Sequence, residues 1–137
     1  MKSLTLDLWD KIIDTIYAES LNNLRMLGHV TKSECERYLA FYGVHGGLFW
    51  CEQDGCLAGV ATAHPGKSLF NWQWPKESGT WTTHLVWAKN KDAIAEVVAQ
   101  LLISTCLPVT ELWAQRGERL TLISETKLER LLSYGRK

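Results

Sequence analysis

The sequence contains no long uninterrupted run of apolar residues. A helix that crosses a bilayer needs about 18 or more mostly apolar residues in a row, and no stretch of this 137-residue chain approaches that length. Its first residues also lack the order of basic, apolar and small residues that marks a secretory signal. We therefore expect a cytoplasmic protein that makes no contact with a membrane.

The chain also has no excess of charge of either sign. Fifteen basic residues balance fifteen acidic ones, so the protein projects no field that would attract a phosphate backbone, and we expect no nucleic-acid partner. Hydrophobic residues make up 46% of the chain and charged residues 22%, which is typical of globular proteins. The length fits one domain, residues 1–137, with its own core.

Metal-binding and redox motifs are missing too. The four cysteines, Cys35, Cys51, Cys56 and Cys106, form no C-x-x-C pair, and we expect them to be reduced and buried. His45 in a glycine-rich loop and His64 before Pro65-Gly66 occupy positions where imidazoles often bind or catalyse. Their spacing from the cysteines matches no zinc pattern, so we expect no metal and no tightly bound cofactor.

Four amphipathic helices are predicted from apolar spacing and end signals. Residues 6–27 form the first, before Gly28. Thr31 and Glu34 make a capping box for the second, which buries Cys35, Tyr38, Leu39 and Tyr42 and ends at Gly43. Asn90 caps the third, which Pro108 stops, and Ser124 caps the last, before Gly135.

The remaining apolar stretches predict strands. Residues 48–52 and 56–63 flank Asp54-Gly55, a pair suited to a type I′ hairpin turn, and this turn places Trp50 opposite Gly59 and Cys51 opposite Ala58. A second hairpin is predicted from residues 68–74 and 80–88. Strands at 109–114 and 120–123 follow. Alternation places two sets of residues each on one face: Phe70, Trp72 and Trp74; Trp81, Thr83, Leu85 and Trp87.

The tryptophans leave three interpretations open. Phe70, Trp72 and Trp74 can be a sheet face packed under helices, or they can stack a ligand ring. A dimer or protein-partner contact through Trp72 and Trp74 is the next alternative, because tryptophan is enriched at interfaces.

The element order predicts an α+β fold with a central antiparallel-rich sheet, a meander plus one crossover strand, packed by helices. This order resembles the central part of the GNAT acetyltransferase superfamily over about residues 6–114. In that superfamily a strand leads into a turn of pattern Q/R-x-x-G-x-G/A, and the following helix binds the pyrophosphate of acetyl-CoA. The matching stretch is Asn90-Lys91-Asp92-Ala93-Ile94-Ala95.

The resemblance implies a truncated acyl-CoA N-acyltransferase-like fold, since the family's first strand and final strand pair are not predicted. A more distant resemblance is to toxin-activating acyltransferases, which use acyl carrier protein. The implied co-substrate is acetyl-CoA or another acyl thioester, because helix N-termini favour phosphate. The implied binding residues are Trp87, Lys89, Asn90, Lys91, Ala93 and Ala95. The alternative is that Asn90 and Asp92 merely complete an ordinary helix start.

Acyl transfer needs a base, an oxyanion donor and an acid for the leaving thiolate. His84, on the strand before the third helix, is the candidate base, and Glu111 is a second. Tyr134 resembles in position the tyrosine that protonates the coenzyme A thiolate in many GNAT enzymes. Each of the three also has a structural alternative, as a packed or solvent-facing residue.

Two functional hypotheses follow. The first is a small GNAT-like protein that binds an acyl thioester and transfers the acyl group to an amine or hydroxyl. The second is a non-catalytic domain of the same build that binds another protein through its tryptophan-rich strands. The sequence does not decide whether the protein is an enzyme.

Overall fold

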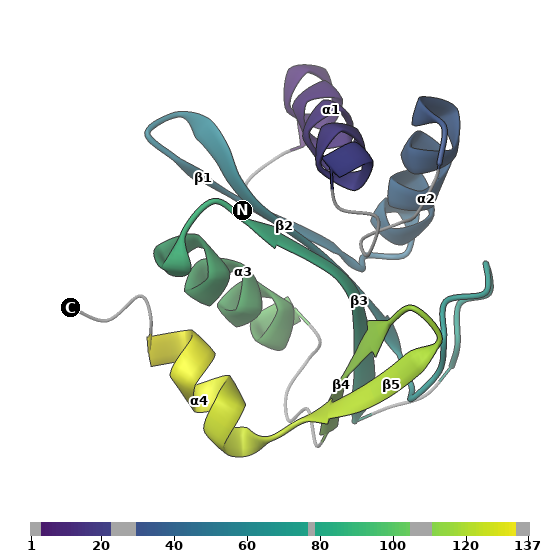
Figure 1. Ribbon diagram of the computed structural model, residues 1–137, viewed down its shortest axis with the longest axis vertical. Helices are drawn as coiled ribbons and strands as arrows, with labels where there is room; N and C mark the ends of the chain where they lie inside the picture. The colour runs from purple at the N-terminus through teal and green to yellow at the C-terminus, as the bar shows by residue number, and fades with distance from the viewer. Residues whose placement is uncertain (1–3, 23–29, 77–78, 105–110, 134–137) are drawn as a thin grey trace.

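One five-stranded sheet with helices on both faces forms the protein, as the computed structural model shows for residues 4–22, 30–76, 79–104 and 111–133. Two helices lie on one face and two on the other (Figure 1). The α+β class is therefore confirmed. The helices are α1 (Leu6–Asn22), α2 (Lys32–Val44), α3 (Lys91–Ser104) and α4 (Glu125–Ser133), and the strands are β1 (Leu48–Gln53), β2 (Cys56–Pro65), β3 (Thr80–Ala88), β4 (Glu111–Arg116) and β5 (Arg119–Ile123).

The strands follow one another across the sheet in chain order. β1, β2 and β3 pair antiparallel, β3 pairs parallel with β4, and β4 pairs antiparallel with β5. A parallel pair needs a crossover connection, which α3 supplies on the face opposite α1 and α2 (Figure 1). The meander thus has three strands, and the crossover delivers a hairpin.

The two faces of the sheet bury separate cores. Between α1, α2 and the sheet, residues such as Ile12, Leu39 and Leu85 are almost fully buried. Between α3 and the other face, small residues dominate, including Ala58 and Ala61. Gly59 lies there because a Cβ at this position would come within 2.7 Å of the Val97 side chain, so the helix packs directly on the strand backbone.

The helix signals read from the sequence are largely confirmed. Thr31 and Glu34 form both bonds of the capping box, and the amide of Ala93 donates to the Asn90 side chain at 2.9 Å. The described part of α1 extends from Leu6 to Asn22, with Leu21 exposed, and the rest of the predicted helix, residues 23–27, lies outside the described residues. Gly28, Pro108, Gly135 and Cys106 lie outside the described residues.

The predicted register of the first hairpin is wrong by one residue beyond its turn. Asp54 and Gly55 both have positive φ, as expected, and Gln53 pairs with Cys56. A bulge then places an extra residue, Ala58, in β2, so that Cys51 instead of Trp50 lies opposite Gly59. Since a bulge needs no turn residue to mark it, the turn alone could not reveal it.

The strand predicted at residues 68–74 does not exist. Residues 66–76, here called the strap, form an irregular segment after β2. Asn71 bonds the amide of Gln73 through its side chain, a local bond that competes with strand pairing, and Trp72 has φ +64°. The strap's rings pack on α2 instead of a strand: Phe70 and Trp74 contact Tyr42.

A second bulge corrects the predicted face of β3. Ala61 pairs with Val86 and Ala63 with Thr83, so His84 and Leu85 together oppose the single residue Thr62. Trp81 consequently packs in the α3 core, whereas Leu85 and Trp87 pack in the core under α1 and α2. Strict alternation had placed all three on one face.

The helices and the cysteines can be compared with what the sequence predicts about membrane spans and buried thiols. None of the helices in the described ranges is long and apolar enough to cross a membrane. Cys35 and Cys51 are buried thiols, as expected, but Cys56 is exposed. Cys56 pairs with Gln53 as the last pair before the hairpin turn.

Candidate functional site

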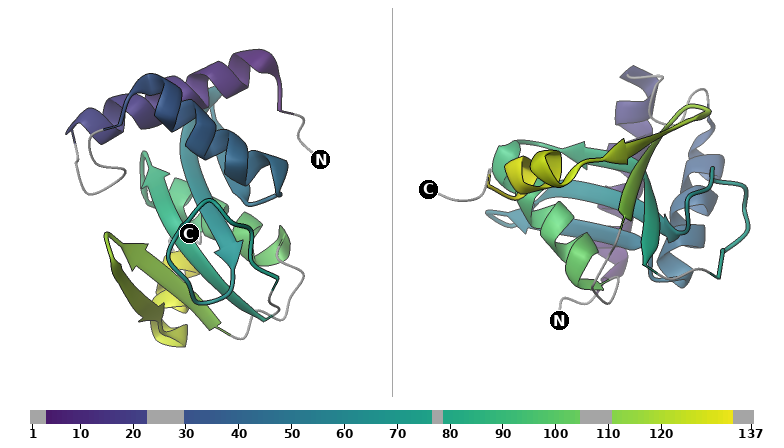
Figure 2. Two further views of the ribbon diagram at one scale, coloured as in Figure 1. Left: turned by 90° about the vertical axis from the view of Figure 1, so that its right-hand side faces the viewer. Right: turned by 90° about the horizontal axis from the view of Figure 1, so that it is seen from below.

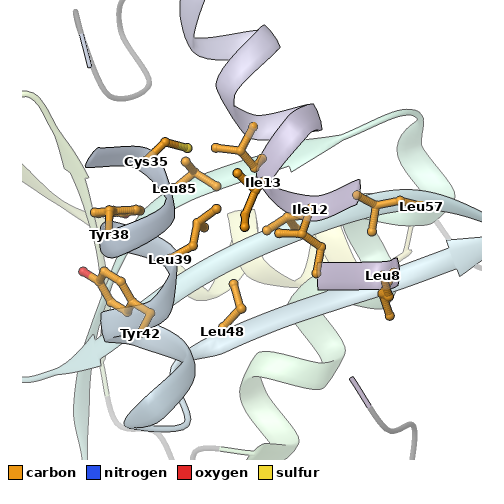
Figure 3. Close-up of a cluster of buried hydrophobic side chains, with 12 residues drawn as sticks. Leu8, Ile12, Ile13, Cys35, Tyr38, Leu39, Tyr42, Leu48, Leu57 and Leu85 are labelled. Carbon is orange, nitrogen blue, oxygen red and sulfur yellow. The ribbon is translucent and has the colours of Figure 1, made fainter. Parts of the chain in front are cut away.

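Two tyrosines of α2 provide the starting point of the site. Tyr38 and Tyr42 are one helical turn apart, so they share the face that α2 turns to the sheet, and both are buried. They lie at one end of the core cluster, away from Leu8 and Leu57 (Figure 3). Because a buried hydroxyl without a partner is costly, both phenols should bond to groups on the sheet.

Tyr38 bonds to groups on β2 and β3. Its hydroxyl lies 2.8 Å from Nδ1 of His84 and 3.0 Å from the Thr62 hydroxyl. The Thr62 oxygen in turn accepts the Leu85 amide at 3.1 Å. The β3 bulge makes this possible, because it turns both His84 and Leu85 toward Thr62 and α2.

The hydrogen bonds of Tyr38 are compatible with two tautomers of His84. The Leu85 amide can only donate, and the Thr62 oxygen that accepts it can also donate to Tyr38 or accept a second bond from it. In the first arrangement Tyr38 donates to Nδ1 of His84 and the imidazole proton resides on Nε2; in the second Nδ1 donates to Tyr38 and Nε2 carries the lone pair. In both arrangements Nε2 of His84 forms no other hydrogen bond within the described residues.

Tyr42 forms a second pair of the same kind with His64. The Tyr42 hydroxyl is 2.8 Å from Nδ1 of His64, and Nε2 of His64 is 2.7 Å from the Ser68 carbonyl. A carbonyl only accepts, so Nε2 carries the proton and Tyr42 donates to Nδ1. Both ring nitrogens of His64 are therefore used in holding α2, β2 and the strap together.

Burial keeps all four groups neutral near neutral pH. It lowers the pKa of His84 to about 4, with a smaller effect from the neighbouring His64. Burial likewise lowers the pKa of His64 and raises the pKa values of Tyr38 and Tyr42 well above the usual range for tyrosine. A neutral imidazole of such low basicity is better suited to donating a hydrogen bond from Nε2 than to removing a proton.

His84 stands where two parallel strands separate. The pairing of β3 with β4 extends from Thr80 to Thr83 and ends at the Thr83–Ala114 pair. His84 and Gln115 are the next residues on the two strands, and β3 continues to Ala88 without a β4 partner among the described residues. Figure 2 shows β3 and β4 close together at their starts and farther apart at their ends.

The strap lies against the site from the side of α2. The Phe70 ring stacks on His84 and on Tyr42, with centroid distances of 5.6 Å in both cases. The Phe70 amide donates to the Gln115 side chain at 2.7 Å, and Lys67 lies over the Trp113 ring. One face of His84 is thus covered by a segment that joins α2 to β4.

The residues expected to bind a cofactor gather at the start of α3, just beyond β3. Asn90 caps the helix and exchanges two hydrogen bonds with Gln53 of the first hairpin. Ala93 and Ala95 are both buried, and Ala93 belongs to the core between α3 and the sheet, which gives its small size a packing role. The structure also places two exposed lysines here, Lys89 and Lys91.

Two of the other expected residues have different surroundings. Trp87 precedes Asn90 by three residues, but its side chain packs in the core under α1 and α2. Glu111 is exposed, accepts the indole N–H of Trp113 at 3.1 Å, and lies opposite Thr80 at the far end of the paired stretch from His84. Tyr134 lies outside the described residues.

The remaining candidates have structural surroundings. His45 is exposed and stacks on Trp74 at 4.7 Å. Across the described ranges, no group of three or more His, Cys, Asp or Glu side chains is placed to hold a metal. Trp72 is 53% exposed, whereas Trp74 is half-buried, so the strap presents these two tryptophans differently.

Sequence reasoning missed Tyr38, Thr62 and Gln115 as parts of the site. A signal for Tyr38 was present, because two tyrosines four residues apart on a buried helix face need polar partners. Thr62 and Gln115 carry no such signal, since their roles depend on the β3 bulge and on the path of the strap.

Comparisons with known proteins identify no relative of this chain. No protein-family model matches the chain, and neither a curated protein nor a solved structure matches it significantly.

Proposed function

We propose that the chain binds an acyl thioester, with acyl-CoA as the donor, in an N-acyltransferase-like fold of the GNAT kind. The acyl group is transferred to an amine or a hydroxyl. The observation that carries the proposal is the separation of β3 from β4 immediately after Thr83, where Nε2 of His84 forms no hydrogen bond within the described residues.

The free edge of β3 suits an extended ligand that contains amides. From His84 to Ala88 this edge has no strand partner among the described residues, and Val86 is 46% exposed. An extended chain can bond to such an edge as an added strand does, and the pantetheine arm of coenzyme A carries two amide groups. The arm would thus run from His84 toward the start of α3.

The start of α3 offers a favourable site for the nucleotide end of that ligand. The helix dipole favours negative charge there, and Lys89 and Lys91 flank the helix start. The Ala93 amide is already used by the Asn90 cap. A phosphate would therefore bind to Lys89, Lys91 and the other amides of the first turn of α3. Alternatively, it would displace the Asn90 side chain from the Ala93 amide.

His84 would stabilise the developing oxyanion in the proposed reaction. The acceptor nitrogen or oxygen attacks the thioester carbon, and the carbonyl oxygen gains charge that an Nε2–H donor stabilises. The C–S bond then breaks, and the thiolate takes up the proton that the acceptor releases. The donor requires the arrangement in which Thr62 donates to Tyr38 and Tyr38 donates to Nδ1, so that the proton resides on Nε2. This replaces the predicted role of base with that of donor.

A thermal melt with a small thioester panel tests the proposal. Acetyl-CoA at about 100 times its Kd should raise the Tm by on the order of 5–10 °C, because a ligand that binds only the folded state stabilises it. Lys91→Glu should reduce the rise with acetyl-CoA but not with acetyl-pantetheine, which has no nucleotide. Lys127→Glu, in the first turn of α4, is the control. If no thioester at millimolar concentration shifts the Tm, the proposal is wrong.

A protein-binding function is the second candidate. It is favoured by Trp72, which is exposed although large and has φ +64°, a strained conformation for a bulky residue. Leu69 beside it is 38% exposed. A size measurement that finds an oligomer lost on Trp72→Ser, together with no thioester effect on the Tm, would favour this function over acyl transfer.

A further inference from the structure

The strap spans the point where β3 and β4 separate. On the β2 side, Nε2 of His64 donates to the Ser68 carbonyl at 2.7 Å. On the β4 side, Gln115 accepts the Phe70 amide at 2.7 Å. Between these two bonds, the Phe70 ring lies on His84. The strap therefore covers one face of the His84 imidazole from the side of α2, and His84 as a whole is half-buried.

The strap is held in this position by contacts of side chains instead of strand pairing. Lys67 lies 4.0 Å from the centre of the Trp113 ring, and the Thr82 hydroxyl donates to the Gly66 carbonyl. Its backbone joins no ladder between Lys67 and Lys76. Segments bound by few backbone hydrogen bonds open more readily than the core elements below them.

Two features of the closed strap carry an energetic cost. Trp72 has φ +64°, a conformation that bulky residues rarely adopt. The Ser68 hydroxyl is buried and has no hydrogen-bond partner within the part of the chain that is described, which is unfavourable for a polar atom. Opening of the strap would relieve both costs, and this relief offsets part of the packing energy that holds the strap closed.

We propose that the strap is a lid over His84, latched by Gln115 and His64, and that it swings away to admit a reactant to His84. The contacts that define the lid are independent of the ligand. The identity of the reactant as an acyl thioester or its acceptor rests on the function proposed above. A closed lid would then shield the thioester from water after binding.

Acylation of His84 by diethyl pyrocarbonate tests the lid without a ligand. In the tautomer protonated on Nδ1, the Nε2 lone pair of His84 attacks one carbonyl of the reagent. Nε2 becomes ethoxycarbonylated, the Nδ1 proton is released, and the departing ethyl carbonate takes up a proton and gives ethanol and carbon dioxide. Mass spectrometry then gives the rate at His84 relative to the exposed His45 in the same molecule. In the parent chain His84 should react at least tenfold more slowly than His45. Equal rates would overturn the lid.

Gln115→Ala removes one latch and should speed the acylation of His84 about fivefold, as expected for the loss of one hydrogen bond of ordinary net strength. Gln73→Ala is the matched control, because Gln73 is exposed on the strap itself. Lys67→Ala is a second opening variant, should the first fold poorly. An unchanged rate in both opening variants would contradict the proposal.

Alkylation of Cys35 in the same samples separates lid opening from unfolding. Cys35 is fully buried in the core under α2 and should stay protected when only the strap moves. If Cys35 and His84 become reactive together, the strap is not an independent lid. If His84 alone becomes reactive but acetyl-CoA leaves the Tm of every variant unchanged, the lid is supported and the proposed function is wrong.

Discussion

Acidification from pH 7 to pH 5 should destabilise the folded chain through His84. Its pKa is about 4 in the folded state and about 6.5 in an unfolded chain, so the unfolded state binds the extra proton first. The stabilisation from the neutral imidazole is complete above pH 6.5 and is lost as the pH falls toward 4. These two values give a loss of about 2 kcal/mol in unfolding free energy between pH 7 and pH 5.

His64 adds to this loss, because burial lowers its pKa as well. The exposed Glu34 has a pKa below its ordinary value of 4.5, so its contribution is lost only at lower pH. Among the described groups, the window from pH 7 to pH 5 therefore reports mainly His64 and His84. Neutral His64 accepts the hydrogen bond from Tyr42, and neutral His84 shares a hydrogen bond with Tyr38.

Urea unfolding followed by circular dichroism at the two pH values measures the effect. His84→Asn keeps an acceptor for Tyr38 but cannot be protonated, so the pH dependence should shrink by about 2 kcal/mol even if the variant is less stable overall. His45→Asn, which removes an exposed imidazole, is the matched control. If His84→Asn retains the full pH dependence of the parent, the reasoning about the buried network is refuted.

Two further substitutions test the packing and the hydrogen bonds with controls inside the chain. Tyr38→Phe leaves buried partners unpaired and should lower the free energy of unfolding, measured in urea, by about 1–3 kcal/mol. The control Tyr17→Phe, at a half-buried position of α1, should lower it by less than about 0.5 kcal/mol. Equal losses in the two variants would count against the hydrogen-bond network. Gly59→Ala forces a Cβ to 2.7 Å from Val97 and should lower stability by about 1–3 kcal/mol. Gly43→Ala has its nearest neighbour at 3.7 Å and should be neutral or raise stability by up to about 1 kcal/mol, so a reversed order of the two glycine variants would contradict the close packing of α3 on β2.

Local chemistry explains why the helix starts and the first turn could be predicted. A capping box at Thr31 and Glu34 and a cap at Asn90 satisfy backbone groups within a few residues of themselves. The positive φ values of Asp54 and Gly55 are likewise a property of those two residues. Such signals need no knowledge of the rest of the fold.

The two β-bulges and the strap depend on distant packing and could not be predicted. An extra residue at Ala58, or at His84 and Leu85, changes which side chains share a face without any marker in the sequence. The alternation of Phe70, Trp72 and Trp74 is typical of a strand, but in the structure these rings pack on Phe41 and Tyr42, which α2 presents.

The candidate site was predicted in part. His84 could be singled out as a titratable group on the strand before α3, and its position at the end of the β3–β4 pairing remains consistent with a role in binding. Its chemistry could not be predicted, because the burial and the hydrogen bond with Tyr38 that keep it neutral come from α2. Whether it acts in catalysis stays a prediction.

The most direct test of the central claim is an NMR titration of the isotope-labelled chain with a non-hydrolysable acetyl-CoA analogue. The account predicts that the largest shifts fall on the backbone amides of residues 84–91 and on the imidazole signals of His84, along the free edge of β3. Shifts that centre on Leu69 and Trp72, or no shift at millimolar analogue, would contradict it.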